Sequence, residues 1–235
     1  MYFTLDGEDS RNIGIHLTEP MEIMAAEEEI EFLDVSGRME GSLTIKKGGF
    51  RDIETELECY IKDITRIGEA YNFLKGIRRM VMSYAPDRAY KVIFTGVPQA
   101  SRLSRSLNAW PITVPVRLKP FRYYEPEPAM ETILQSGDPI TNPGTQASAP
   151  RIAIYGTGDI RVTIGTQPIE LSGIEDGIII DSELKNCYEL NGITRIYDDD
   201  KVDIDKFPQI LPGINYISWT GSVSKITILP RWRDR

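Results

Sequence analysis

The side chains that could support catalysis or metal binding are scattered along the 235 residues. The densest carboxylate cluster comprises Asp198, Asp199 and Asp200, with Asp203 and Asp205 close behind. A calcium ion needs six to eight oxygen ligands and usually a glycine that bends the loop around it. This cluster contains no glycine, so we interpret it as a solvated turn and predict no metal site.

The residues that could act as nucleophiles or bases do not form a recognisable set. His16 is the single histidine and lies on the polar side of an alternating pattern, which is typical of a solvated residue. Cys59 and Cys187 fall in different predicted domains, so we expect two free, half-buried thiols formed in a reducing cytosol. The Gly156-Thr157-Gly158 run lacks the following helix whose N-terminus would bind phosphate. We therefore predict no catalytic residue and no cofactor.

Trp219 and Trp232 are the residues best placed to stack on a sugar ring, because both lie near the end of a predicted β-domain. Tryptophans in such positions more often anchor a core or an interface. A carbohydrate-binding β-sandwich that contacts a cell wall therefore stays an alternative function. A glycosidase is a third candidate, but it needs two carboxylates about 5–10 Å apart, and no diagnostic pair is evident.

Charge is segregated along the first half of the chain. Residues 12–37 carry seven carboxylates and no lysine or arginine, namely Glu19, Glu22, Glu27, Glu28, Glu29, Glu31 and Asp34. Residues 70–124 carry one acid, Asp87, and ten bases, namely Lys75, Arg78, Arg79, Arg88, Lys91, Arg102, Arg105, Arg117, Lys119 and Arg122. Either these groups are solvated or paired within the fold, or the acidic patch of one copy meets the basic patch of the next. The second contact would be heterologous and would generate a ring or a filament. Its candidate residues are Glu27, Glu28, Glu29, Glu31, Arg78, Arg79, Arg102 and Arg105.

The overall composition limits the function further. A net charge of −8 argues against general nucleic-acid binding, since the phosphate backbone would be repelled unless a basic face dominated locally. No apolar run approaches the ~20 residues of a membrane span. Residues 1–7 lack the basic and apolar blocks of a signal peptide.

The elements that would position these side chains divide at residues 126–150, where five prolines and two glycines occur. Prolines exclude a central strand or a long helix, so we expect an extended connector there. It would join a domain at residues 1–125 to a domain at residues 151–235.

The first domain alternates in a way that predicts a sheet with one helix. Residues 53–61 have strict period two, with Leu57, Cys59 and Ile61 on the buried side. Glycines on both sides of Arg38 indicate a loop or hairpin, after which a strand resumes at residues 42–45. Residues 64–77 change to three- and four-residue spacing and predict an amphipathic helix packed on the sheet.

The second domain predicts a β-sandwich of short strands. Residues 152–155 and 160–165 are expected as two strands joined by a tight turn at residues 156–159. Residues 214–219 and 223–228 are expected as a closing hairpin around residues 220–222.

These pieces together resemble the distal tail protein (Dit) family of tailed phages and prophages. The matching segments in the first half are residues 1–7, the loop Gly37-Arg38-Met39-Glu40-Gly41-Ser42-Leu43, and Tyr71-Asn72-Phe73-Leu74. Those in the second half are Asn142-Pro143-Gly144-Thr145, residues 160–164, residues 207–215, Trp219, and Pro230-Arg231-Trp232. Their order and spacing carry the resemblance over nearly the whole chain.

The resemblance implies a structural hub at the distal tail tip of a siphovirus virion, with no enzyme activity. It implies an N-terminal β-sandwich with one helix that forms a homo-hexameric ring, and a C-terminal, galectin-like jelly-roll β-sandwich. The implied partners are the tail tube protein, the tail-associated fibre or hub protein, and a receptor-binding protein. DNA would pass through the ring without specific binding. The protein would be made in the cytoplasm of the bacterial host, with no cofactor and no membrane contact.

Overall fold

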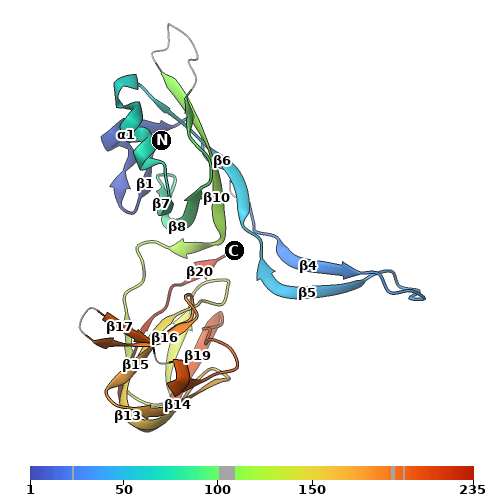
Figure 1. Ribbon diagram of the computed structural model, residues 1–235, viewed down its shortest axis with the longest axis vertical. Coiled ribbons are helices and arrows are strands. Elements are labelled where there is room, and N and C mark those ends of the chain that lie inside the picture. The colour runs from blue at the N-terminus through green and yellow to red at the C-terminus, as the bar shows by residue number, and fades with distance from the viewer. Residues whose placement is uncertain (23, 101–108, 192–193, 198) are drawn as a thin grey trace. The chain divides into compact units, whose positions relative to one another are not determined.

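The chain is described by a computed structural model that covers residues 1–22, 24–100, 109–191, 194–197 and 199–235. It divides into two compact units (Figure 1). The first comprises Met1–Glu125 together with Arg235, and the second comprises Pro126–Asp234. The described residues are mainly strand with one short α-helix, which confirms the predicted fold class.

The first unit is built on an antiparallel sheet with the strand order β2-β1-β7-β8-β10-β6-β3, with β9 pairing to β10. Its strands are β1 (Phe3–Leu5), β2 (Glu8–Asp9), β3 (Ile15–Leu17), β6 (Ile53–Ile61), β7 (Ile77–Met82), β8 (Ala85–Phe94), β9 (Gln99–Ala100) and β10 (Trp110–Tyr124). The long pairing of β10 with β6 runs from Trp110 opposite Ile61 to Leu118 opposite Ile53. This register brings the buried side chains of both strands to one face, where the core forms.

The alternation of β6 matches the sequence prediction. Leu57, Cys59 and Ile61 are fully buried, whereas Glu54, Glu56 and Glu58 are exposed on the other face. Successive side chains of a strand point to opposite faces, so a period of two produces one apolar and one acidic face.

The helical segment is shorter than predicted. It begins with a 3-10 turn, η2 (Ile64–Arg66), and continues as α1 (Ile67–Phe73), so the helix predicted to extend to residue 77 ends four residues early. Gly76 has φ of +78°, a conformation that stops a helix and suits glycine. Ile77 then starts β7, where it lies opposite Ile93. A second 3-10 turn, η1 (Ser10–Ile13), precedes β3.

A separate two-stranded hairpin belongs to the first unit and is here called the arm. It consists of β4 (Glu28–Leu33), β5 (Leu43–Phe50) and the connecting residues 34–42 (Figure 1). Its two strands pair with each other and form a sheet of their own. At the base, the ring of Phe50 meets that of Phe121 edge-on at 5.3 Å, and Lys119 pairs with Asp52 at 3.0 Å.

The second unit is a curled antiparallel sheet that encloses an isoleucine-rich core. Its main strand order is β11-β19-β13-β15-β16-β17. In addition, β12 pairs with β19, β14 pairs with β13, and β18 pairs with β14. The strands are β11 (Glu131–Ile133), β12 (Asp138–Asn142), β13 (Arg151–Ile164), β14 (Gln167–Ile174), β15 (Gly177–Asp181), β16 (Asn186–Asn191), β17 (Thr194–Tyr197), β18 (Val202–Asp203) and β19 (Gly213–Leu229). The short strand β20 (Arg233–Asp234) is not part of this sheet. A 3-10 turn, η3 (Asp199–Lys201), precedes β18.

Two turns that the sequence predicts in this unit are wrong. The stretch at residues 156–159 lies inside the continuous strand β13, and residues 220–222 lie inside the continuous strand β19. The pairing of β13 with β19 shifts register at Tyr155/Gly156 and again between Thr157 and Arg161. The glycines therefore mark bulges at which two long strands bend, because a bulge, like a turn, favours glycine.

The proline-rich stretch at residues 126–150 is also more structured than the predicted connector. It contains β11 and β12, and both pair with β19. Pro139 lies in β12, and the described pairing of β12 is with β19 alone. A strand that pairs on one side is an edge strand, where proline is tolerated. This stretch is therefore part of the second unit. None of the helices in the described ranges is long and apolar enough to cross a membrane.

Candidate assembly surfaces

Burial shapes the environments of the residues considered for catalysis. The ring of His16 stacks on that of Tyr60 with centroids 5.3 Å apart, and burial, followed by nearby positive charge, lowers its pKa. Burial raises the pKa of the Cys59 thiol to about 12, so at neutral pH it stays protonated. Cys187 is also buried. Within the described ranges, no group of three or more His, Cys, Asp or Glu side chains could hold a metal ion.

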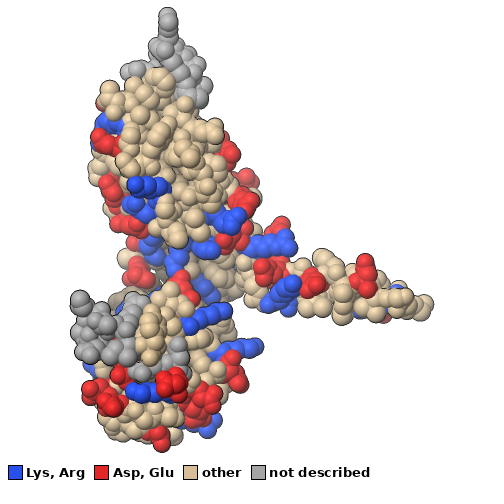
Figure 2. All heavy atoms as spheres, in the orientation of Figure 1, with Lys and Arg blue, Asp and Glu red and all other residues tan. Residues whose placement is uncertain are grey.

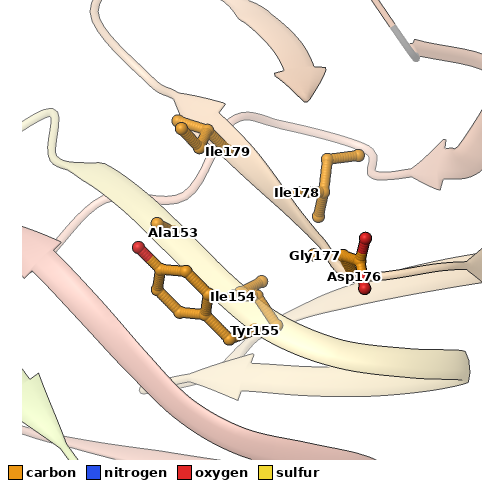
Figure 3. Close-up of a pocket in the computed structure, with 7 residues that line it drawn as sticks. All are labelled: Ala153, Ile154, Tyr155, Asp176, Gly177, Ile178 and Ile179. Atoms are coloured by element: carbon orange, nitrogen blue, oxygen red, sulfur yellow. The ribbon is translucent and has the colours of Figure 1, made fainter. Parts of the chain in front are cut away.

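A small pocket lies on the surface of the second unit between β13 and β15 (Figure 3). Its volume is about 160 Å³, and it lies where Tyr155 of β13 is opposite Gly177 of β15. On the β19 side, the ammonium of Lys225 lies 4.6 Å from the centroid of the Tyr155 ring. Asp176 supplies a carboxylate at the edge of this pocket. The pocket could bind a small apolar group.

The two tryptophans considered for sugar stacking are not equally accessible. Trp232 is buried, with 4% of its surface exposed. Trp219 is half-buried, and its register partner Val162 is fully buried in the core. Its backbone N–H donates to Ser136 Oγ at 2.8 Å. A sugar ring could therefore reach Trp219 in part, but not Trp232.

The acidic candidates of the arm form ion pairs at its base and along it. Glu28 pairs with Lys46 at 3.0 Å and with Arg235 at 3.5 Å. Glu31 pairs with Lys47 at 3.1 Å, and Glu27 lies 4.0 Å from Arg51. Figure 2 shows acidic and basic side chains next to one another at this base. A hydrogen bond from Lys46 lowers the pKa of the Glu28 carboxyl.

The remaining acidic groups of the arm have no such partners. Glu29, Asp34 and Glu40 are exposed, and none makes an ion pair among the described residues. The Glu29 carboxylate lies over the backbone of Gly49.

The basic candidates that the structure describes are also paired. Arg78 contacts Asp6 at 2.5 Å and Glu8 at 3.9 Å. Arg79 pairs with Glu125 at 2.7 Å and donates to the carbonyl oxygen of Tyr124 at 2.9 Å. Arg102 and Arg105 lie outside the described residues.

The structure thus brings Glu27, Glu28 and Glu31 to the arm, and Arg78 and Arg79 to β7. It does not bring these two groups into contact with each other. Each of these five residues finds a partner elsewhere in the first unit, so their charge is compensated within one copy. Surface ion pairs of this kind contribute about 0–1 kcal/mol each, so they do little more than neutralise their neighbourhood.

The arm carries a second feature, which the sequence analysis missed. Large apolar side chains are exposed on both of its faces and at its tip. Leu33, Leu43 and Ile45 share one face, where Leu33 lies directly opposite Leu43. Phe32 is 68% exposed on the other face, and Met39 in the connecting loop is 100% exposed. The exposed apolar residues of the arm are Phe32, Leu33, Val35, Met39, Leu43 and Ile45.

This feature had a signal in the sequence. Phe32 and Leu33 are consecutive, and a strand with one buried face cannot bury both. An isolated two-stranded hairpin is at best marginally stable in water. The arm therefore has the composition of an element that packs against another chain.

The outer face of β6 offers a different surface. Glu54, Glu56 and Glu58 are exposed along it, and Arg117 of β10 pairs with Glu54. Opposite Glu56 and Glu58 lie Pro115 and Thr113, which carry no charge. The described part of this face is therefore acidic around Glu56 and Glu58.

The fold of this chain is similar to those of phage tail-tip and baseplate components. Among solved structures, the Dit protein of phage SPP1, described as a hub of the adsorption apparatus in phages that infect Gram-positive bacteria, has a TM-score of 0.70. Its identity is 14%, and the match covers 97% of each chain.

Two structures of the phage P2 baseplate in its activated conformation match less closely. The one with Ca has a TM-score of 0.55 at 9% identity and covers 100% of this chain and 98% of that chain. The one with Sr has a TM-score of 0.54 at 10% identity and covers 97% and 96%. No protein-family profile and no curated protein sequence matches the chain. The fold expected from the resemblance to the Dit family is therefore confirmed from structure.

Proposed function

We propose that this chain is a structural hub of a phage tail tip, without enzyme activity. Six copies form a ring that joins the tail tube to the tail-associated fibre or hub protein, and DNA passes through the ring. The second unit provides a surface for receptor-binding proteins. The proposal is supported by the shared fold with the SPP1 Dit protein and the phage P2 baseplate structures.

The single observation that carries the proposal is the arm. Six large apolar residues are exposed on a hairpin that has no core of its own. Monomeric proteins rarely expose such an apolar patch unless it is an interaction site. An exposed apolar hairpin of this kind is suited to assembly with another chain.

The channel of the ring is proposed to be lined by the outer face of β6. Glu56 and Glu58 there would repel the phosphate backbone, so DNA would move without being held. A lysine in either position would instead add salt-dependent affinity for DNA.

This function can be tested by mixing the purified chain with the tail tube protein of a phage that encodes this chain. Analytical ultracentrifugation should show a stoichiometric complex whose mass corresponds to one ring of six copies on one ring of tube subunits. Removing the exposed apolar groups with the variant Leu33→Ser/Leu43→Ser/Ile45→Thr should abolish the complex while the chain stays folded. A wild-type chain that stays monomeric with both the tube and the hub protein present would refute the proposal.

A further inference from the structure

The arm of one copy needs a docking place on the next copy, and the exposed apolar and charged groups of the first unit indicate where it lies. The inference rests on the proposed ring and names the surfaces that form its seam. Because each copy would use two different surfaces, the contact is heterologous, as a closed ring requires.

The arm contributes an apolar tip flanked by acids. Val35 and Met39 are 47% and 100% exposed, and Asp34 and Glu40 come directly beside them in the chain. Neither carboxylate makes an ion pair with the described residues, whereas Glu27, Glu28 and Glu31 further down the arm do. The tip thus presents two acidic groups and one base, Arg38, around an exposed apolar surface.

The complementary surface in the first unit lies where β7 begins. Ile77 is 72% exposed and lies opposite Ile93, so these two side chains share one face of the sheet. Two residues earlier, Lys75 is exposed, and its ammonium donates to Asn72 Oδ1 at 2.8 Å. Within the described ranges, Lys75 pairs with no carboxylate, unlike Arg78 and Arg79 close by.

We propose that Val35 and Met39 of one copy pack on Ile77 and Ile93 of the next copy, with Asp34 and Glu40 facing Lys75. Burying the exposed apolar groups supplies the attraction, because each side chain removed from water contributes favourably. The opposite charges at the rim fix the orientation and exclude wrong pairings, which is the usual contribution of rim charges. The arm would gain the packing surface that a two-stranded sheet needs.

Mixed cross-linking tests this seam. One preparation carries Met39→Cys and another carries Ile77→Cys, and both native cysteines are buried. After assembly with tube protein, a short bismaleimide should give a cross-linked dimer in the mixture and none in either preparation alone. The double variant Met39→Cys/Ile77→Cys should give a ladder up to the full ring. The control pair Met39→Cys with Tyr216→Cys, in which Tyr216 is an exposed residue of the second unit, should give no specific product.

Charge reversal is a second, independent measurement that avoids apolar changes. Lys75→Glu should raise the concentration needed for half-assembly by about fivefold, the scale of exposed ion pairs. Combining it with Asp34→Lys/Glu40→Lys should restore assembly. Lys62→Glu, an exposed lysine outside the proposed seam, is the matched control and should assemble like wild type.

The outcomes separate this inference from the proposed function. Rings that form without a Met39–Ile77 cross-link, and without a compensating effect of the charge exchange, would overturn the seam while the hub function stands. Absence of rings with tube and hub proteins present would overturn both.

Discussion

At the scale of single residues, Asp181 and Arg231 connect distant parts of the second unit. Asp181 is 2% exposed and accepts hydrogen bonds from Arg231 at 2.7 and 2.9 Å. Its Oδ1 also accepts from the backbone N–H groups of Glu183 and Leu184, both at 3.1 Å. The pair therefore links the end of β15 to the segment that follows β19.

The pKa of Asp181 follows from two opposing effects. Burial, the larger single contribution, raises it, but the hydrogen bonds from Arg231 and the backbone together with the positive charge of Arg231 outweigh burial. The folded-state pKa is therefore below the ordinary value of 3.8. A carboxyl with a depressed folded pKa stabilises the fold above its unfolded pKa and loses that contribution as the pH falls through the folded pKa.

We predict that Asp181→Asn lowers the free energy of unfolding by roughly 2–3 kcal/mol at pH 7, because Arg231 loses its buried partner. The difference from wild type should shrink as the pH falls below about 4, where this carboxyl begins to protonate in the unfolded chain, and further as the pH falls through the lower folded-state pKa. Denaturant unfolding followed by circular dichroism at several pH values measures this. The exposed Asp176→Asn is the control. A difference that stays constant down to pH 2 would contradict the assignment.

The pairing of charged side chains was only partly predictable from the sequence. The segregation into acidic and basic stretches is real, but sequence separation does not reveal ion pairs across a hairpin. Glu28 and Lys46 are 18 positions apart and yet 3.0 Å apart in space. The unpaired groups Asp34, Glu40 and Lys75 could be distinguished only after the paired ones had been assigned.

At the scale of elements, glycines allow β13 and β19 to bend. A Cβ on Gly156 would lie 2.3 Å from the carbonyl oxygen of Ser222, and one on Gly221 would lie 2.5 Å from that of Asp159. Gly156 and Gly221 therefore let the two backbones approach more closely than any side chain would permit. Both strands can then curl around the isoleucine core without interruption.

Gly156→Ala should destabilise the second unit by about 1–3 kcal/mol, the scale of an overpacked site. The clash is with backbone, which cannot move aside as a flexible side chain would. Thermal unfolding of the full chain measures the effect, and the exposed neighbour Thr157→Ala should leave the midpoint close to wild type. An unchanged midpoint for Gly156→Ala would show that the close approach is not required.

The arm should be the least protected part of the first unit in the absence of partners. Its backbone hydrogen bonds join two strands exposed on both faces, and local opening of such elements costs little free energy. Amide hydrogens of β4 and β5 should exchange rapidly in the monomer and slow by at least about tenfold on assembly, whereas those of β6 stay protected throughout. Slow exchange of β4 and β5 in the isolated monomer would contradict this.

How much of the fold the sequence predicts depends on the kind of pattern. The period of two at residues 53–61 predicted β6 and its buried side correctly. Gly156 and Gly221 misled because turns and bulges share the same local signal, and only the long-range pairing of β13 with β19 separates them. The hairpin around Arg38 was indicated, but its exposure was not, because exposure depends on what the rest of the chain leaves uncovered.

At the scale of the whole molecule, the proposed ring has to pass DNA without retaining it. The double variant Glu56→Lys/Glu58→Lys should convert a repelling channel face into an attracting one. We expect assembled rings of this variant to retain short duplex DNA in a gel-shift assay at low salt, with affinity that falls steeply as salt rises. Wild-type rings should show no shift. Glu175→Lys/Asp205→Lys makes the same change in net charge on the second unit and is the matched control. Equal retention by the control would remove the channel assignment.

The proposed ring would give a role to both the arm and the acidic face of β6. In such a ring the neighbouring copy would cover the exposed apolar groups of the arm. The carboxylates of β6 would repel DNA only if they lined the channel through which it passes. The fold itself is shared with phage tail-tip proteins.

Electron microscopy of the chain assembled with its tube and hub proteins tests this central claim most directly. Class averages viewed along the tail axis should show a closed ring of six copies around a hollow centre. Particles without a closed ring, or a ring without an open centre, would contradict the account.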